Sequence, residues 1–406
     1  HGGLSGIGNL ESGITSMETP AMKTMAVIVF FGIFLLVTGL ISFYIFIRGW
    51  QSIPAGSSLR HPYAILFWIV ALSFIGGRLM ENYLPSALSD LLIWVGSFWI
   101  AAMIYFLIAV VSLDVLRLIN HFLPFFPSAV TRNYAQVKYI LAACVTGIVG
   151  IVLVAGHINS LMPRVRELEL TVAKQAGSMK ALNIVAVSDV HLGTIVGRSR
   201  FDSIAEKINS LHPDLVLFAG DIVDEDLAPV IKQNLGESLR SIRAPLGVFA
   251  ITGNHEYIGG VEQACKYLTD HDIVMLRDRG VRINDAFYLV GREDRMIGRR
   301  NGKLRKALHE LMATVDARYP VILMDHQPFG LDEAATAGVD LQISGHTHYG
   351  QLWPMNYIVE RIYELAWGYR KIAGTHFYVS NGVGTWGPPV RVGNRPEIVN
   401  IRLNFR

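Results

Sequence analysis

The chain has 406 residues, which is enough for two or three domains, and 51% of them are hydrophobic. These residues are concentrated in the first part of the chain, a distribution that is typical of a membrane protein. The formal net charge of +3 is too small to indicate a nucleic-acid partner, and we expect none. The two cysteines, Cys144 and Cys265, lie far apart, so they indicate neither a disulfide framework nor a zinc-thiolate site.

The N-terminal part divides into a lead-in and a transmembrane domain. Residues 1–22 are rich in glycine and have no periodicity, so we interpret them as an expression tag with a disordered segment. Residues 23–160 contain apolar segments that can each cross a hydrocarbon core, which needs about 20 residues. We predict four spans, at about 24–47, 62–80, 91–113 and 138–158. A cleaved signal peptide is the alternative for the first span, but its apolar run is too long for one.

Two features near the membrane edges bear on how this part is arranged. The segment 115–127 is too short and too broken by proline to cross the membrane, so we expect it to lie at the interface. Arg78, at the end of the second span, has a side chain long enough to reach the lipid headgroups. We therefore expect Arg78 and Glu81, like His157 near the end of the fourth span, to anchor the spans at the interface, and a substrate pathway is the alternative.

The distribution of basic residues predicts the orientation. Four spans place both ends of the transmembrane domain on the same side of the membrane. The first and third loops carry most of the basic residues, which favours a cytoplasmic position for these loops. They are Arg48, Arg60, Arg117, Arg132 and Lys138. The rest of the chain would then be extracytoplasmic, on a plasma or inner membrane, although Arg164, Arg166 and Lys174 favour the opposite orientation.

From residue 163 to residue 406 the pattern is that of an α/β domain. Val165–Val172 alternates apolar and polar residues, as a half-buried strand does. Further strand-like runs alternate with amphipathic segments, and the chain ends with a strand-rich region, Thr375–Leu403. The helical segments are Phe201–Leu211, Val230–Ser241, Val261–His271 and Lys303–Val315. This order predicts two packed sheets flanked by helices.

Five of the strand-like runs end at a side chain that can bind a metal. The run that begins at Asn183 ends in Asp189-x-His191, and residues two apart in a strand share a face, so we expect both side chains to point to one place. The other runs end at Asp221, at Asn254 and His255, at His326, and at His346 and His348. Ligands gather outside the carboxyl ends of strands in open α/β sheets. We therefore expect one cluster.

The ordered set over residues 183–348 resembles the calcineurin-like metallophosphoesterases. The motifs that carry the resemblance are Asp189-x-His191, Gly220-Asp221-x-x-Asp224, Gly253-Asn254-His255-Glu256, His326 and Gly345-His346-x-His348. Each motif is weak alone, but five in this order are specific. The resemblance implies two packed sheets and a centre of two divalent metal ions. The mixed ligand set without a thiolate suits Mn, Fe or Zn.

The same resemblance assigns a role to each residue. It implies that Asp189, His191 and His348 hold one ion, that Asn254, His326 and His346 hold the other, and that Asp221 bridges the two. It also implies that His255 is catalytic and donates a hydrogen bond or a proton to the phosphoryl group or the leaving oxygen. Asp224 and Glu256 are expected to orient histidines from outside the ligand set.

Two stretches near the C-terminus, Tyr378–Thr385 and Pro389–Ile398, are similar to the branch that contains UDP-2,3-diacylglucosamine pyrophosphatase-like enzymes. Together with the membrane domain, this similarity predicts a hydrolase for a phosphoester or pyrophosphate of a lipid or lipid-linked substrate. One alternative is a membrane-tethered phosphodiesterase or phosphatase for soluble substrates such as nucleotides. Another is a non-catalytic receptor or scaffold, which the complete ligand set argues against.

Two segments of the second half have two interpretations each. Arg277–Lys306 is strongly basic, which indicates either a solvated surface or a surface that holds anionic headgroups or a phosphate-bearing substrate. Trp353–Ile372 mixes Trp and Tyr with Arg and Lys directly after His348. We expect it to face the membrane or to cover the substrate, and an ordinary surface helix is the alternative.

Overall fold

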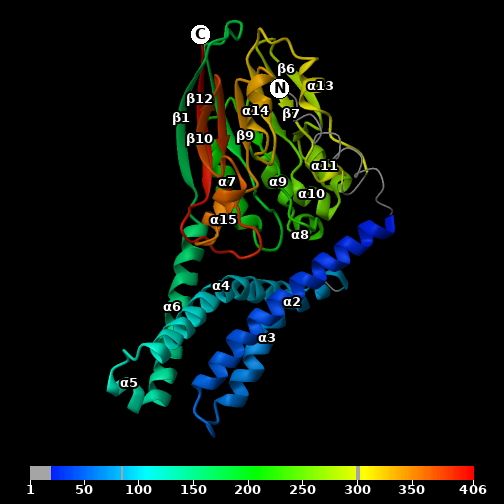
Figure 1. Ribbon diagram of the computed structural model, residues 1–406. Coiled ribbons are helices and arrows are strands. Elements are labelled where there is room, and N and C mark those ends of the chain that lie inside the picture. The colour runs from blue at the N-terminus through cyan, green and yellow to red at the C-terminus, as the bar shows by residue number, and fades with distance from the viewer. Residues whose placement is uncertain (1–19, 84–85, 299–301) are drawn as a thin grey trace. The chain divides into compact units, whose positions relative to one another are not determined.

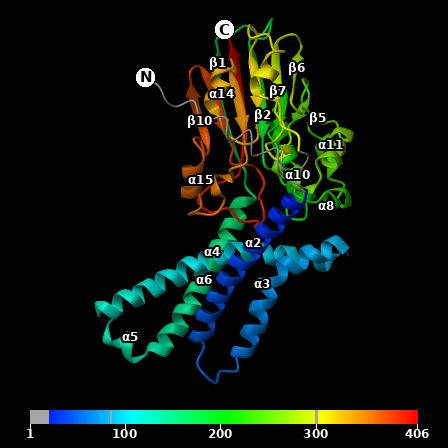
Figure 2. The ribbon, with the colours of Figure 1, turned by 45° about the vertical axis from the view of Figure 1, so that its right-hand side comes forward.

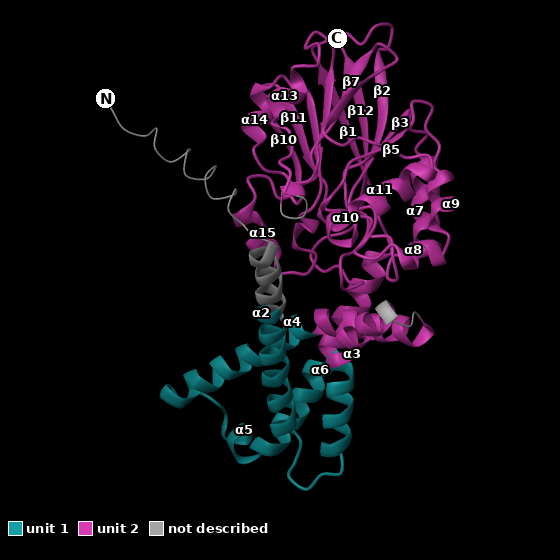
Figure 3. Cartoon of the chain, turned by 90° about the vertical axis from the view of Figure 1, so that its right-hand side faces the viewer, with its two compact units in different colours: residues 1–71, 103–147 teal, residues 72–102, 148–406 magenta. Residues whose placement is uncertain are grey.

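The computed structural model describes residues 20–83, 86–298 and 302–406 (Figure 1). The chain divides into two compact units (Figure 3): residues 1–71 with 103–147, and residues 72–102 with 148–406. The second unit holds the α/β domain and parts of three apolar helices. The expected lead-in, residues 1–22, lies largely outside the described residues. The domain boundaries near residues 22 and 160 stay predictions.

Four long helices form the N-terminal part: α2 (Pro20–Ser52), α3 (Arg60–Tyr83), α4 (Ala87–Phe122) and α6 (Tyr134–Ser160), with the short α5 (Ser128–Arg132) between the last two. Within the described residues, three helices are long and apolar enough to cross a membrane: Arg60–Glu81, Ala87–Phe122 and Tyr134–Ser160. Four spans were predicted. The first, about 24–47, falls within α2, and the side chains of residues 20–31 and 34 lie outside the described part of the chain.

Residues 115–122 of the segment that was predicted to be interfacial belong to helix α4, and the interfacial position of 115–127 stays a prediction. Helix α4 continues without a break through residues 115–122 and ends at Phe122, two residues before Pro124. The residues up to Phe122 contain neither proline nor glycine, so nothing in this stretch interrupts a helix, whereas the residue before a proline is disfavoured in the α conformation. Proline therefore ends the helix here, and α4 extends beyond the predicted span.

The α/β domain contains two six-stranded mixed sheets (Figures 1 and 2). The first has the order β1-β12-β2-β3-β4-β5, formed by Arg164–Val172, Glu397–Phe405, Ala181–Val187, Leu215–Phe218, Val248–Ala250 and Val274–Met275. The second has the order β10-β11-β9-β8-β7-β6, formed by Gly368–Ile372, Thr375–Val379, Leu341–Ser344, Val321–Met324, Phe287–Gly291 and Arg279–Ile283. Neighbouring strands from β2 to β5 are parallel, and so are β7, β8, β9 and β11.

Both faces of β3, β4 and most of β2 are buried in the first sheet, which explains the continuous apolar runs of these strands. In β2, Ile184 belongs to the core between the two sheets, whereas Val185 belongs to the core beneath the helices, as the two-residue period of a strand requires. Helices α7 (Arg198–Ser210), α9 (Leu235–Arg240) and α11 (Val261–Asp270) cover this sheet, and α13 (Leu308–Met312) and α14 (Leu331–Thr336) cover the other (Figure 3). The expected architecture of two packed sheets flanked by helices is confirmed.

Two of the expected helices differ from the sequence pattern. The segment Val230–Ser241 forms two helices, α8 (Ala228–Lys232) and α9, because Asn234 between them has a left-handed φ of 53°. Of Lys303–Val315 only Leu308–Met312 is α-helical, since the residues before it are drawn into contacts with buried carboxylates. Arg305 pairs with Asp325 at 2.9 Å, and the backbone N–H of Lys306 donates to Asp278 at 2.7 Å.

The C-terminal end of α6 packs directly on the α/β domain, within the second unit. A ring nitrogen of His157, Nδ1, lies 2.7 Å from the carbonyl oxygen of Pro389, and the Asn159 amide donates to the carbonyl of Arg391 at 3.0 Å. The contact is tight, because a Cβ atom at Gly156 would lie 2.6 Å from Cγ1 of Val390. The C-terminal end of the apolar helix α6 is therefore packed against the loop that joins β11 to β12.

Candidate metal centre

The predicted ligands follow parallel strands of both sheets. Asp189 and His191 follow β2, Asp221 follows β3, Asn254 and His255 follow β4, His326 follows β8, and His346 and His348 follow β9. The structure brings eight acidic and histidine side chains of this region into three groups that could hold a metal ion, and these include every predicted Asp and His ligand. The expected convergence at the carboxyl ends of the strands is thus present.

The reason given for that convergence was wrong. Strand β2 ends at Val187, so Asp189 and His191 do not share a strand face. Both lie in a turn with left-handed backbone, with φ angles of 54° and 53°, and Asp221, His346 and His348 also have positive φ. Such conformations are costly for residues other than glycine and cluster at functional sites. The turns, and not the strands, aim the side chains inward.

The first group contains Asp189, His191 and His348, all buried. The Nε2 atoms of the two histidines are 3.0 Å apart, and Nε2 of His348 lies 3.6 Å from a carboxylate oxygen of Asp189. Two neutral imidazoles that point these nitrogens at each other would otherwise need a proton on one of them to make a hydrogen bond. A divalent cation between them would accept both lone pairs, so this donor set fits a metal ion.

The second group contains Asp221, His326 and His346. The ring of His326 is held by its Nδ1, which lies 2.7 Å from the carbonyl oxygen of Ala219, and its Nε2 faces Asp221 at 3.1 Å. Burial, followed by the positive charge of His326, lowers the pKa of His346 to about 3. Since metals bind the neutral imidazole, His346 is ready to bind without losing a proton.

Asn254, the first residue of α10 (Asn254–Gly259), supplies a further oxygen atom. Its side-chain Oδ1 is buried and has no hydrogen-bond partner among the residues that the structure describes. Buried polar atoms are rarely left in this state unless an ion or a water molecule satisfies them. The amide oxygen therefore also fits a metal ligand.

Asp224 connects the first group to His255. One of its carboxylate oxygens, Oδ1, lies 3.1 Å from Nδ1 of His255 and 3.4 Å from Nδ1 of His191. Burial acts to lower the pKa of His255, but the charge of Asp221 and the hydrogen bond to Asp224 outweigh it and raise this pKa to about 9. His255 is therefore protonated at neutral pH, and its Nε2–H is oriented away from Asp224.

Glu256 lies at the other side of the same loop and is almost completely buried. It was expected to orient histidines, but its carboxylate accepts hydrogen bonds from four backbone N–H groups, of Asp221, Ile222, Val223 and Gly253, at 2.7–3.1 Å. A buried N–H group without a partner costs about 1–3 kcal/mol. Glu256 thus fixes the backbone that presents Asp221, and it does so without touching a histidine ring.

Two residues near the centre were not predicted. The fully buried Arg391 places Nη2 3.3 Å from Nδ1 of His348 and donates to the carbonyl of Gly384 at 2.7 Å. Burial and the nearby charge of Arg200 lower the pKa of Arg391 to about 9. Trp386 is 53% exposed, and its ring centre is 5.9 Å from that of His255. Both lie in the loop between β11 and β12, which has no metal-binding pattern. Arg391 falls within the similar stretch Pro389–Ile398, whereas Trp386 lies between the two similar stretches and nothing in the sequence marked it.

The basic stretch from Arg277 to Lys306 is partly neutralised by ion pairs within the domain. Arg277 pairs with Glu293 at 2.6 Å, and Arg292 and Arg305 both pair with Asp325. Arg299 and Arg300 lie outside the described residues. Arg295 is exposed and stacks on the ring of Phe329 at 5.2 Å. Internal ion pairs therefore neutralise part of this positive charge.

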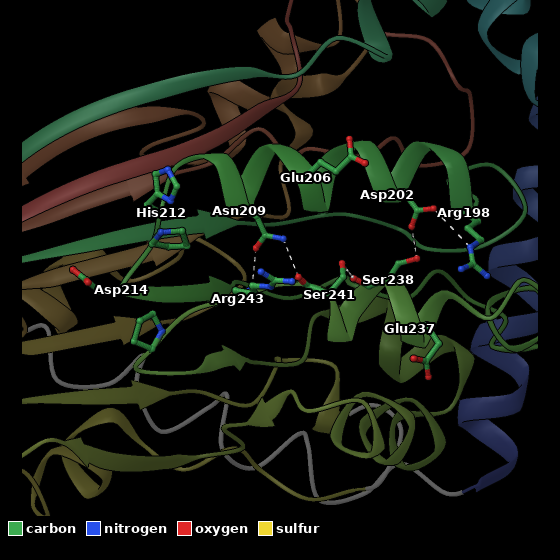
Figure 4. Close-up of a pocket in the computed structure, with 12 residues that line it drawn as sticks. Arg198, Asp202, Glu206, Asn209, His212, Asp214, Glu237, Ser238, Ser241 and Arg243 are labelled. Carbon is green, nitrogen blue, oxygen red and sulfur yellow. Dashed lines mark hydrogen bonds and ion pairs between the residues drawn. The ribbon is translucent and has the colours of Figure 1, made fainter.

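A separate hollow of about 690 Å³ lies between α7 and α9 (Figure 4). None of the predicted site residues lines it. Its polar groups bind one another: the side chain of Asn209 bonds to the carbonyl of Ser241 and to the backbone N–H of Arg243, each at 2.8 Å. These contacts hold α7 against the segment that follows α9, and we assign the hollow no role in the metal centre.

The chain is similar to known proteins over this domain. Residues 182–350 match the family described as calcineurin-like phosphoesterase. An uncharacterized metallophosphoesterase of Aquifex aeolicus is 31% identical over 249 residues, which are 61% of this chain and 94% of that protein. A Bos taurus protein named transmembrane protein with metallophosphoesterase domain is 33% identical to this chain. The match covers 67% of this chain and 64% of the Bos taurus protein. The 5'-nucleotidase precursor from Thermus thermophilus has a TM-score of 0.35 at 14% identity, over 55% of this chain and 54% of that chain. The chain therefore belongs to the calcineurin-like metallophosphoesterases, a family of metal-dependent phosphoester hydrolases with a two-metal centre.

Proposed function

We propose that this membrane protein hydrolyses a phosphoester or pyrophosphate bond of a lipid or lipid-linked substrate, whose headgroup reaches the metal centre from the bilayer surface. One observation carries the proposal. The backbone N–H of Arg391 donates to the carbonyl of Gly156 in α6 at 3.0 Å, while its guanidinium lies 3.3 Å from the predicted ligand His348. A single residue thus joins the end of a membrane-spanning helix to the metal centre.

The surface next to this contact is apolar and exposed. Helix α15 (Asn356–Ile362) has no buried residue, and Tyr357, Ile358 and Ile362 are each more than half exposed. Trp353, just before the helix, is held to the same loop by a hydrogen bond from its backbone N–H to the carbonyl of Val392 at 2.8 Å. Exposed apolar and aromatic side chains at a membrane edge suit the interfacial region of a bilayer. This supports the interpretation of 353–372 as membrane-facing.

The predicted residues divide the chemistry between them. We assign Asp189, His191 and His348 to one ion, Asn254, His326 and His346 to the other, and Asp221 to both. Two divalent ions bound here would neutralise the phosphoryl oxygens and activate a water molecule. The imidazolium of His255 donates a proton to the leaving oxygen, and Asp224 holds the ring so that Nε2–H faces the substrate.

Hydrolysis by the full-length chain in lipid nanodiscs tests this function. The protein is stripped with a chelator, resupplied with Mn²⁺, Zn²⁺ or Mg²⁺, and assayed with lipid phosphates, lipid pyrophosphates, nucleotides and a chromogenic phosphodiester. We expect no turnover in the stripped protein and metal-dependent release of phosphate or headgroup from a lipid, since the centre lies beside the end of α6. The product identifies the bond that is broken.

The other outcomes separate the alternatives. Metal-dependent activity that is confined to nucleotides and the soluble diester would replace the lipid proposal with a membrane-tethered phosphodiesterase or phosphatase. No activity with any metal would contradict a hydrolase and favour the receptor or scaffold. Mutation of the exposed Ile358 to Glu should lower activity on lipid in nanodiscs and leave the soluble diester unaffected, if α15 faces the bilayer.

We propose further that the metal centre is extracytoplasmic, at a plasma or inner membrane. The basic residues of the first and third loops lie at one end of the first unit: Arg48 pairs with Asp114 at 2.6 Å, and Lys138 donates to the carbonyl of Gln51 at 3.0 Å. The positive-inside rule favours a cytoplasmic position for this end. A cysteine at the exposed Glu310 should react with a membrane-impermeant maleimide in intact cells, and labelling only after lysis would contradict this orientation.

A further inference from the structure

Helix α3 carries two charged residues near its C-terminal end that belong to the second unit, together with the metal centre (Figure 3). From the sequence, Arg78 and Glu81 were expected to anchor the span at the lipid headgroups. In the structure they pair with each other at 3.2 Å, and the side chain of Glu81 is only 4% exposed. A carboxylate that is buried to this extent is not in contact with headgroups, so the anchoring interpretation does not describe it.

Both residues contact the loops that carry the centre. Glu81 accepts a hydrogen bond at 2.8 Å from the hydroxyl of Thr194, which lies three residues after His191. Nη2 of Arg78 lies 3.6 Å from Oδ2 of Asp224 and 3.7 Å from a carboxylate oxygen of Glu225. These two loops run side by side, since the N–H of Asp224 donates to the carbonyl of Leu192 at 3.0 Å. The end of α3 thus contacts both the loop after β2, through Glu81, and the loop after β3, through Arg78.

Asp224 is held from both of its oxygens. Oδ1 faces His255 and His191, and Oδ2 faces Arg78. Among the described residues, Arg78 is the one arginine or lysine within ion-pair distance of this carboxylate. An ion pair to one oxygen of a carboxylate restricts its rotation, so that the other oxygen stays directed at a histidine. Mutation of such partners outside the ligand set typically lowers metal affinity or activity by about 10–100-fold.

We infer that Arg78, a residue of a membrane-spanning helix, is a positioning residue for His255 and His191 that acts through Asp224. The inference rests on the proposed phosphoesterase function. It makes the transmembrane domain a part of the active site's support as well as its anchor. The fully formed centre then requires α3 to be in place, so turnover depends on how that helix is seated in the bilayer.

The test compares variants of the full-length chain in nanodiscs. Arg78→Ala removes the guanidinium, Arg78→Lys retains a charge that reaches one carboxylate, and Arg78→Gln serves if the alanine variant does not insert. The matched control is Lys232→Ala, which removes an exposed ion pair of 3.4 Å to Asp90 on α4 and touches no site residue. Readouts are kcat and KM for a chromogenic phosphodiester with Mn²⁺, Mn²⁺ affinity by electron paramagnetic resonance, and the unfolding temperature.

We expect Arg78→Ala to lower kcat by about 10–100-fold with KM changed less than about 2-fold, and to weaken Mn²⁺ binding about 10-fold. Arg78→Lys should recover part of both losses, and Lys232→Ala should change neither. The double variant Arg78→Ala with Asp224→Asn should have a kcat and a Mn²⁺ affinity close to those of Asp224→Asn alone, because both substitutions remove the same contact. Unchanged kcat and Mn²⁺ affinity in Arg78→Ala would overturn the inference, as would strictly additive losses.

This design separates the inference from the function on which it rests. If the unmodified protein hydrolyses no phosphoester with any metal, the proposed function fails, and the Mn²⁺ affinities of the variants still test the role of Arg78. A second case is an active unmodified protein in which Arg78→Ala lowers both the activity and the unfolding temperature. If the lower stability accounts for the whole loss of activity, Arg78 has only a structural role. Loss of kcat and Mn²⁺ affinity at an unchanged unfolding temperature supports positioning.

Discussion

Replacing His255 with Ala should lower kcat by about 10²–10⁴-fold, the usual contribution of a general acid. The side chain faces Asp224 and makes edge-to-face contacts with the rings of His191 and Trp386, and it has no hydrogen bond to a strand among the described residues. Folding and membrane insertion should therefore survive the substitution, and so should Mn²⁺ binding, because His255 is outside the proposed ligand set. Steady-state kinetics in nanodiscs, with circular dichroism and metal analysis, measure these effects.

The pH dependence gives a second readout for this residue. The raised pKa of about 9 keeps His255 protonated below that pH, so activity that needs its proton should fall as pH rises through the pKa. Asp224→Asn removes the hydrogen-bonding carboxylate that raises the pKa, and should move the alkaline limb to lower pH. His309→Ala, an exposed histidine on α13, is the control. Full activity of His255→Ala would refute the assigned role.

Replacing Asp221 with Asn should abolish turnover and reduce the bound metal to fewer than two ions per chain. Asp221 lies 3.1 Å from His326 and 3.9 Å from His191, so its carboxylate reaches both groups. Burial acts to raise its pKa, but the neighbouring positive charges of His326 and His255 outweigh this and hold the pKa well below its ordinary value. The loss should exceed about 100-fold, since partners outside the ligand set already contribute 10–100-fold.

The isosteric amide makes this a test of charge and not of shape. Asn can still accept the hydrogen bond that the backbone N–H of His255 donates to Asp221 at 2.8 Å. Metal content by mass spectrometry and kcat should therefore fall together, while the far-ultraviolet spectrum stays unchanged. Asp332→Asn, on the exposed face of α14, controls for the loss of one negative charge. Two tightly bound ions in Asp221→Asn would remove the bridging role.

The strands, and the order along the chain of the candidate ligands that follow them, could be predicted because both depend on local sequence patterns. Apolar runs that are buried on both faces appear directly in the sequence, and each of the five ended at a metal-capable side chain. The left-handed backbone at Asp189 and His191 could not be predicted, because positive φ is uncommon outside glycine and no local pattern in the sequence marks it here. The convergence was therefore predicted correctly from an incorrect local geometry.

Contacts between distant segments account for most of what was missed. Glu256 directly follows His255 in sequence, yet its carboxylate bonds to backbone groups 33–35 residues earlier. Arg391 follows His348 by 43 residues, and Arg78 precedes Asp224 by far more. Charged residues at the end of an apolar segment have the same pattern whether they meet headgroups or a carboxylate. Only the packing of α3 and α6 on the domain decides between them.

The position of β12 has a consequence for how the chain is made. This strand, residues 397–405, lies between β1 and β2 in the first sheet, with β1 parallel and β2 antiparallel to it. Within the described residues, the strand that emerges first from α6 thus pairs with a strand more than two hundred residues later, and contacts of such separation form slowly. The membrane helices can be inserted during translation, but the sheet beside them cannot be completed until residue 405 has left the ribosome. Until then β1 lacks its partner β12, and an unpaired strand edge can pair prematurely with another chain.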